Sequence, residues 1–469
     1  MSDNNTKALK SGSWYIVSSF LVRGMALITT PIFSRLLSKE QYGDYSNFHS
    51  WLNIITIVVT MRMEASLISA KFDYKDDLPK YNRSMIALLT VVTVIWTAVL
   101  NIFSGFFTTQ MGISLFYANM IMVYSFFHAV INIFQMNERY HYRYKKSVMV
   151  ALIVAFSTTL TSILMVLFMK DRLTGRVVGS ILPVTAIGLA LVFVFFRRKR
   201  SIDVSSWPYT LRIAIPYVPH LLSLSVLNSV DRIMITRICG SADNALYTIA
   251  YSCGHMVNIL MTAINSAYAP WLGDKLHDGE EHEVRRFSKY YMIGFSLLAV
   301  GLMLLAPEIL RIMGPKSYQA AKYVMPPVAT GCVCQFLYTQ YVNLEQLKKK
   351  TAGMAFASVA AALLNYILNA IFIPKFGYVA AAYTTLAGYL FLLIAHMFLV
   401  HRIGLGKVYD YRFVLGLAAV MIGVCGGVSL LYTHTPARYG AVAVLAAVLG
   451  YIVWRNRTIA KKLVKRIIK

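Results

Sequence analysis

Five charged side chains occur inside stretches that are otherwise apolar: Arg23, Arg62, Glu64, Asp231 and Arg232. A charge at the centre of a bilayer costs roughly 3 kcal/mol on insertion scales, so each of these groups needs polar surroundings. A guanidinium carries a rigid fork of donors that matches phosphate oxygens. We therefore predict that Arg23, helped by Arg62 and Arg232, binds a diphosphate group. Glu64 and Asp231 are candidates for ion coupling. Snorkelling of Arg62 and Glu64 to the interface is the competing interpretation.

Uncharged polar residues form two stripes inside apolar segments. Steps of three or four residues place each stripe on one face of a helix. We predict that both stripes line a central hydrated cavity, although hydrogen bonding between packed helices is an alternative for any single residue. The first stripe consists of His49, Asn53, Thr56 and Thr60, and the second consists of Tyr251, His255, Asn258, Thr262 and Asn265.

The elements that carry these residues are predicted to be transmembrane helices. The chain is 57% hydrophobic and 14% charged over 469 residues, which is too apolar for a soluble protein. A spanning helix needs about 20 mostly apolar residues, and such runs recur often enough to predict an all-α, multi-pass membrane protein of about fourteen helices. The predicted helices cover residues 14–34, 43–65, 84–107, 114–136, 147–169, 177–196, 213–236, 244–268, 290–310, 321–343, 351–373, 378–400, 413–432 and 439–454.

The net charge of +26 raises the question of a nucleic-acid partner, but the distribution of charge favours a membrane. With these helices and a cytoplasmic N-terminus, 32 of the 46 Lys and Arg residues fall on the cytoplasmic side, 11 on the other side and 3 within the membrane. This bias follows the positive-inside rule. It predicts a bacterial cytoplasmic-membrane protein with both termini in the cytoplasm and no nucleic-acid partner. The first helix is expected to be retained rather than cleaved as a signal peptide.

Neither the cysteines nor the glycines indicate a metal, a cofactor or ATP hydrolysis. The five cysteines lie mostly in hydrophobic segments, and the pair Cys332 and Cys334 has the wrong spacing for a zinc or redox site. The Gly406-Lys407 pair has His401 where the leading glycine of a phosphate-binding loop belongs. We therefore predict a protein that is not an enzyme.

The chain also contains an internal repeat with an offset of 202 residues. This offset places Ser34-Arg35 on Thr236-Arg237 and Tyr45-Ser46 on Tyr247-Thr248, and it also aligns Lys146 with Lys348 and Gly175 with Gly377. It predicts two parallel six-helix lobes, residues 1–200 and 201–402, followed by two extra helices and a basic tail in residues 403–469. Transporters built from such repeats place their substrate site between the repeats.

Three stretches resemble the polysaccharide (O-antigen type) flippases of the multidrug/oligosaccharidyl-lipid/polysaccharide exporter superfamily, and the resemblance covers nearly the whole chain. They are residues 31–37 (PIFSRLL) with 42–46 (YGDYS), residues 231–237 (DRIMITR) with 265–271 (NSAYAPW), and residues 364–369 (LNYILN) with 373–378 (IPKFGY).

The resemblance implies a V-shaped pair of six-helix lobes that moves an undecaprenyl-diphosphate-linked oligosaccharide by alternating access, driven by an ion gradient or membrane potential. A polysaccharide polymerase and glycosyltransferases are implied as partners. Related lipid II flippases use cavity arginines on helices 1, 2 and 8. Arg23 and Arg62 match the first two by helix, whereas helix 8 has His255 instead, and Arg232 is the candidate substitute.

Three alternatives stay open. A lipid II flippase is the nearest alternative. A drug or cation antiporter of the same superfamily would usually have twelve helices and acidic cavity groups. A membrane glycosyltransferase or O-antigen polymerase would typically have larger external loops than this sequence provides.

Overall fold

The computed structural model describes residues 21–22, 24–25, 28–75, 77–141, 143–197, 201–348 and 352–455. All regular elements in these ranges are helices, which confirms the all-α prediction. The backbone forms two compact units that interleave along the chain. The first unit comprises residues 1–249, 313–315 and 350–388, and the second comprises residues 250–312, 316–349 and 389–469.

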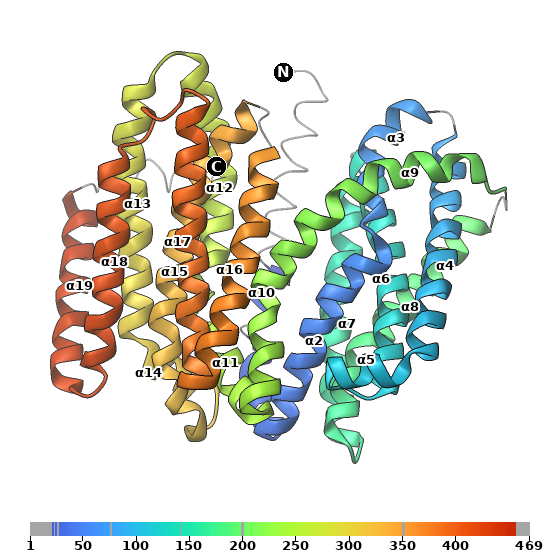
Figure 1. Ribbon diagram of the computed structural model, residues 1–469, viewed down its shortest axis with the longest axis horizontal. Helices are drawn as coiled ribbons and strands as arrows, with labels where there is room; N and C mark the ends of the chain where they lie inside the picture. Colours follow the sequence, from blue (N-terminus) through green and yellow to red (C-terminus); the bar gives the residue numbers. More distant parts are fainter. Residues whose placement is uncertain are drawn as a thin grey trace. The chain divides into compact units, whose positions relative to one another are not determined.

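The first unit contains the helices from α2 to the start of α11, together with α16 and the first part of α17 (Figure 1). Within it, α7 packs along α8, and α10 packs against both α2 and α16. The bounds are α2 Lys39–Thr60, η1 Met63–Ser66, α3 Leu67–Asp73, α4 Leu78–Ile102, α5 Ser104–Met111, α6 Leu115–Tyr140, α7 Tyr144–Phe168, α8 Arg172–Phe196, η2 Val204–Ser206, α9 Trp207–Ala214, η3 Ile215–Tyr217, α10 Val218–Cys239, α11 Ser241–Gly254, α16 Ala352–Phe376 and α17 Tyr378–Arg402.

The second unit is arranged around α15, which packs against α12, α13 and α18. It also contains the ends of α11 and α17. Its other elements are α12 Val257–His277, α13 Glu281–Leu304, α14 Ala306–Met313, η4 Lys316–Val324, α15 Met325–Leu347, α18 Tyr411–Leu431 and α19 Thr435–Arg455.

The helices are suited to a membrane. In the described part of the chain, nine helices are long and apolar enough to span a bilayer, and a bent pair formed by Lys39–Thr60 and Met63–Asp73 is a tenth candidate. Phe168 (82% exposed) and Ile102 (74% exposed) are examples of large apolar side chains on the surface, where contact with lipid is more favourable than contact with water. A multi-pass membrane protein is therefore confirmed, whereas the predicted number of fourteen spans is not.

Glycines allow a close contact between α7 and α8 in the first unit. A Cβ on Gly175 would lie 2.6 Å from the carbonyl oxygen of Met165, and a Cβ on Gly179 would lie 2.5 Å from the Cα of Ser162. Thr161 donates a hydrogen bond of 2.6 Å to the Gly179 carbonyl. Small residues of this kind let membrane helices pack backbone to backbone, which explains the tight pairing of α7 and α8.

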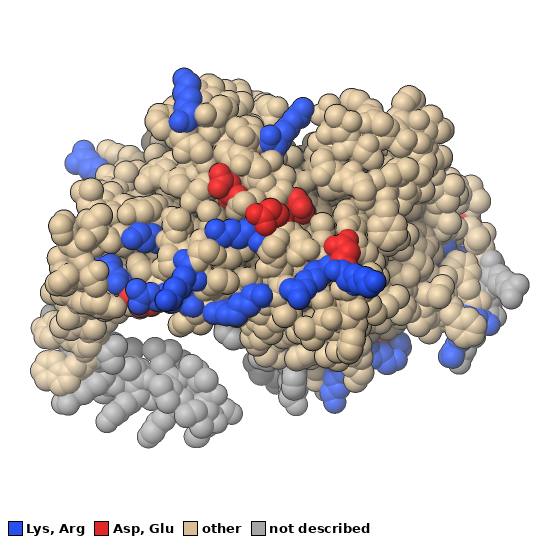
Figure 2. Space-filling view, turned by 90° about the horizontal axis from the view of Figure 1, so that it is seen from below, with Lys and Arg blue, Asp and Glu red and all other residues tan. Residues whose placement is uncertain are grey.

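Charged side chains lie mainly at the helix ends. The end of the molecule seen in Figure 2 carries both basic and acidic side chains amid uncharged surface. In the first unit, α2 begins with Lys39 and Glu40, and α8 begins with Arg172 after Asp171. Ser38 and Gln41 form a reciprocal capping box at the start of α2.

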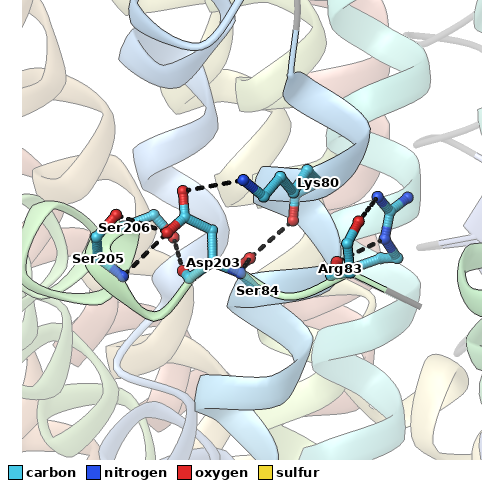
Figure 3. Close-up of polar contacts among 7 residues, drawn as sticks. Lys80, Arg83, Ser84, Asp203, Ser205 and Ser206 are labelled. Carbon is cyan, nitrogen blue, oxygen red and sulfur yellow. Dashed lines mark hydrogen bonds and ion pairs between the residues drawn. The ribbon is translucent and has the colours of Figure 1, made fainter. Parts of the chain in front are cut away.

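The segment that leads into α9 is fastened to the start of α4 (Figure 3). The backbone N–H of Asp203 donates to the Ser84 hydroxyl at 2.6 Å, and the Asp203 carboxylate lies 3.7 Å from the Lys80 ammonium. Arg83 donates to the Ser201 carbonyl at 3.1 Å. Hydrogen bonds from Ser205, together with the charge of Lys80, hold the pKa of Asp203 below its usual range.

Candidate functional site

The first candidate group is a cluster of cationic residues in the first unit. Arg23 lies outside the described residues. Arg232 on α10 donates from Nη1 to the carbonyl of Asn228 at 2.8 Å. Arg232 and Arg176 both lie close enough to His49 for their charges to act on its imidazole. The charge of Arg232 thus acts on His49, although the sequence assigned the two residues to different roles.

Arg176 was not among the predicted site residues. Its guanidinium carbon lies 3.6 Å from the ring centroid of Phe33 and 4.4 Å from that of Tyr45, so it is held between two aromatic faces. The sixth helix was predicted to start at residue 177, but α8 starts at Arg172. Extending the predicted helix by one turn would have placed Arg176 inside it.

Arg62 and Glu64 lie at a break in the second helix rather than in a continuous helix. The predicted segment 43–65 was expected to be one helix, yet α2 ends at Thr60 and the chain bends by 48° before α3. Met61 (φ 47°) and Arg62 (φ 52°) both adopt left-handed backbone conformations. For residues other than glycine these conformations cost about 1–2 kcal/mol each, and such strain is often found at functional sites.

The break brings Arg62 and Glu64 together as an ion pair. Arg62 Nε lies 3.2 Å from Glu64 Oε1, with side-chain exposures of 40% and 5%. The Thr60 hydroxyl accepts from the backbone N–H of Arg62 at 3.2 Å, which partly satisfies the broken helix end. Arg62 therefore has a half-exposed guanidinium that is oriented by a buried acid.

The α2 stripe has an exposed part and a buried part. His49 and Asn53 are exposed, and the Asn53 amide lies 3.2 Å from His49 Nδ1. Thr56 is buried, with its hydroxyl 2.9 Å from that of Ser125 on α6, and Thr60 is also buried. His49 and Asn53 are accessible, as residues of a cavity wall must be. Thr56 is instead covered by α6, and Thr60 is buried.

The second stripe lies in the second unit, across the junction between α11 and α12. Tyr251 stacks on His255 with ring centroids 5.2 Å apart. The predicted helix 244–268 is interrupted at His255 and Met256, and α12 continues to His277. Thr262 is half-buried and donates to the Asn258 carbonyl at 2.9 Å.

The polar residues of α12 contact a polar face of α15 that the sequence did not reveal. Asn258 donates to Gln335 at 2.6 Å, and Asn343 donates to Asn265 at 2.9 Å. Asn258 also lies 2.6 Å from the Nε2 of His255. Amide residues in the predicted helix 321–343 were the available signal, since two of them turn out to face the stripe.

Asp231 of the first unit is a buried acid with three side-chain hydrogen bonds. It is 1% exposed. Its carboxylate accepts hydrogen bonds from Tyr247 of α11 at 2.6 Å, Asn369 of α16 at 2.7 Å and Thr385 of α17 at 2.6 Å. Thr384 donates in turn to the Asn369 side-chain oxygen. We call Asp231, Tyr247, Asn369, Thr384 and Thr385 the Asp231 cradle. It gathers carboxylate, amide and hydroxyl oxygens, which are groups suited to a proton or a hard cation.

Two residues related by the repeat offset contact each other in the first unit. The hydroxyls of Ser46 on α2 and Thr248 on α11 are 2.6 Å apart. Nearby, Asn244 donates to the Gly43 carbonyl at 2.9 Å, and a Cβ on Gly43 would meet the Ser241 carbonyl oxygen at 1.7 Å. The contact therefore joins two positions that the predicted 202-residue repeat would make equivalent.

Comparison with known families gives two matches. Residues 8–276 match the family model described as polysaccharide biosynthesis protein, and residues 216–371 match the model described as MatE. A protein of Haemophilus influenzae named after the Lsg locus is 23% identical over 319 residues, which is 64% of this chain and 75% of that protein.

Two solved structures share the fold. One is the lipid II flippase MurJ in an inward closed conformation, with a TM-score of 0.67, 14% identity, and coverage of 94% of this chain and 99% of that chain. The other is a multidrug resistance MATE family transporter of the MOP superfamily in an inward-facing conformation. It has a TM-score of 0.65 and 12% identity, and the likeness covers 82% of this chain and 95% of that chain.

Proposed function

The chain belongs to the polysaccharide biosynthesis protein family and has the fold of a MOP superfamily transporter, and we propose that it moves an undecaprenyl-diphosphate-linked oligosaccharide across the bacterial cytoplasmic membrane by alternating access. The family and fold are those of flippases and transporters rather than catalytic enzymes. In this proposal both termini face the cytoplasm, and the substrate moves from the inner to the outer leaflet.

The observation that carries the proposal is the set of cationic side chains in the first unit. Arg176 and Arg232 act electrostatically on the exposed His49, and Arg62 presents a half-exposed guanidinium at the helix break. A diphosphate carries concentrated negative charge and several acceptor oxygens, which guanidinium groups bind well. Arg62, Arg232 and Arg23 are therefore proposed as the diphosphate ligands, with Arg176 as an addition.

The polar stripes suit the sugar part of the same substrate. Sugar hydroxyls lose their hydrogen bonds in hydrocarbon, and an unsatisfied polar group costs several kcal/mol there. Exposed polar side chains such as His49 and Asn53 on α2, and the half-buried His255 and Asn265 of the second stripe, offer replacement partners. The polyprenyl tail can stay in the lipid throughout.

We further propose the Asp231 cradle as an ion-coupling centre. A carboxylate among buried hydroxyls and amides changes its hydrogen bonding when a proton or cation binds, and this change can bias the packing of α10, α16 and α17. We expect Asp231→Asn, which keeps the shape of the side chain but removes its charge, to abolish the dependence of transport on an ion gradient. Glu64→Gln, at the second candidate acid, serves as the comparison.

The substrate class is testable in cells. A deletion strain should lose its surface polysaccharide and regain it with the unchanged gene. Glycosyltransferases would supply the substrate and a polymerase would consume it, so lipid-linked repeat units should accumulate in the deletion strain. Rescue of a strain depleted of its lipid II flippase, with no change in polysaccharide, would support lipid II instead. Altered drug resistance alone would support an antiporter.

A further inference from the structure

A buried acid–imidazole pair links α15 and α17 in the second unit. Glu345 lies in the last turn of α15, and its Oε1 is 2.9 Å from the Nδ1 of His396 on α17. Each of the two side chains is only 2% exposed. The ring of Tyr338 stacks on the His396 ring, with centroids 5.4 Å apart and planes 15° apart. The pair is thus enclosed by protein and joins two helices of this unit.

The carboxylate of this pair is only half satisfied. Glu345 Oε2 is buried and has no hydrogen-bond partner within the described ranges of the chain. An ionised carboxylate can accept about four hydrogen bonds, and a buried polar atom without a partner is costly. A proton on Oε2 would neutralise the carboxylate while leaving the contact of Oε1 with His396 in place.

Glu308 in the same unit provides the contrast. Its two oxygens accept hydrogen bonds from Arg438 at 2.6 Å each, and Oε1 also accepts from Tyr439 at 2.8 Å. These hydrogen bonds from Arg438 lower the pKa of Glu308 to about 2. Glu308 therefore stays ionised under all ordinary conditions, whereas the partner of Glu345 is an imidazole that contacts only one of its two oxygens.

The other titratable groups on the elements around α15 are engaged elsewhere. His396 is the one ion-pair partner of Glu345 among the described residues. Among the charged groups and histidines of the neighbouring elements, Lys289 of α13 pairs with Asp410 before α18, Lys322 of η4 contacts Tyr432, and His255 contacts Asn258 of α12. Three tyrosines are also in contact with other side chains. Tyr268 of α12 contacts Ser288, Tyr291 of α13 packs on Phe336, and Tyr341 of α15 packs on Tyr409.

We propose that Glu345 and His396 form a proton-binding site that makes the packing of α15 against α17 depend on protonation. With one proton shared between the two groups, the pair is neutral overall, which is the charge state that a low-dielectric interior tolerates best. Loss of this proton leaves an uncompensated negative charge, and gain of a second leaves a positive charge. The proton is exchanged with water when the two helices separate, and no other reactant is required.

The site can be tested on the purified, detergent-solubilised protein without substrate. Infrared difference spectroscopy across a pH titration detects the carbonyl band of a protonated carboxyl group. We expect Glu345→Gln to remove one such band and His396→Asn to shift its pH midpoint. The matched control Glu308→Gln should leave the spectrum unchanged, because that acid stays ionised. A spectrum that is the same in the unchanged protein, Glu345→Gln and His396→Asn would overturn the proposal.

A neutral double variant protects the test against misfolding. Glu345→Gln with His396→Asn keeps two hydrogen-bonding side chains and removes both titrations, and size-exclusion chromatography verifies that it is folded. We expect it to bind about two protons fewer than the unchanged protein across a titration that covers both steps, and about one fewer across the first step alone. Equal proton uptake by both proteins would contradict the site.

The consequence for transport rests on the proposed function and is measured separately. In vesicles with an imposed pH gradient, the double variant should transport the lipid-linked oligosaccharide at a rate that no longer changes with the gradient. If the unchanged protein transports nothing, the proposed function fails while the infrared result still decides the proton site. If the double variant keeps full pH dependence, the coupling role of the pair is wrong and the flippase function stands.

Discussion

Asp231 in the first unit and Glu345 in the second are both almost fully buried acids, but their surroundings differ. Asp231 accepts hydrogen bonds from three side chains on three other helices, whereas Glu345 contacts His396 through one oxygen and has no partner among the described residues for the other. The hydrogen bonds to Asp231 tie its carboxylate to side chains of α11, α16 and α17. The buried Oε2 of Glu345 is left available to accept a proton. In our proposals, Asp231 therefore couples ion binding to the packing of several helices, whereas Glu345 and His396 bind a proton between two helices.

The largest expected effect is that of removing the saturated acid. Asp231→Ala leaves the donors of Tyr247, Asn369 and Thr385 without their shared acceptor, at about 1–3 kcal/mol for each buried group left unpaired. We expect this variant to lose more thermal stability than any of the other single variants, measured by unfolding in detergent. Asp278→Ala, at an exposed position, is the control. Equal melting temperatures for the two variants would show that the hydrogen bonds to Asp231 contribute little.

Removing the half-satisfied acid should have a smaller effect. Glu345→Ala deprives one imidazole N–H of its acceptor, which costs about 1–3 kcal/mol, but it also removes the unpartnered oxygen. We expect a loss of stability clearly below that of Asp231→Ala in the same unfolding assay. A greater loss for Glu345→Ala would reverse the comparison and indicate that Glu345 is the better satisfied acid.

These differences mark the limits of sequence analysis. Composition and apolar run length were enough to predict a helical membrane protein, and they identified Asp231, Arg62 and Glu64 as unusual. The partners of Asp231 could not be predicted, because Asn369 and Thr385 lie 138 and 154 residues away and become neighbours only when α10, α16 and α17 pack.

Two further features were hidden for local reasons. The break at Met61 and Arg62 carries no glycine or proline, so the usual signals of a helix end were missing. Periodicity correctly placed Thr56 on one face of α2, but it could not indicate that Ser125 of α6 covers this part of the face. The spacing of polar residues shows which face of a helix they share. Whether that face is exposed or buried depends on the helix that packs next to it.

Removing a single donor from the Asp231 cradle sharpens the comparison further. Thr385→Val keeps the shape of the side chain and deletes one of the three hydrogen bonds, so we expect a loss of about 1 kcal/mol. Unfolding experiments on Thr385→Val, Asp231→Ala and the double variant form a cycle that isolates the coupling between the two residues. If the two losses of stability simply add in the double variant, the 2.6 Å hydrogen bond between Thr385 and Asp231 contributes no free energy of interaction.

The smallest effect is expected at Asp203, a half-buried acid outside the apolar helices. The pKa of Asp203 is lowered by Ser205 and Lys80, so its contribution to stability is present at neutral pH and is lost as the pH falls through this lowered pKa. Fluorescence of Trp207, whose indole N–H donates to the Ser84 carbonyl at 3.0 Å, reports on this segment. We expect Asp203→Asn to flatten the acid-induced fluorescence change. A transition of unchanged size in this variant would assign the change to another group.

The central claim is that cationic side chains of the first unit bind the diphosphate of a lipid-linked oligosaccharide. Its most direct test is the rate at which a fluorescent undecaprenyl-diphosphate oligosaccharide crosses the bilayer of reconstituted vesicles. Arg232→Ala should reduce this rate strongly, whereas Arg237→Ala, at the exposed end of the same helix, should leave it nearly unchanged. Full transport by a correctly inserted Arg232→Ala and Arg62→Ala double variant would contradict the account.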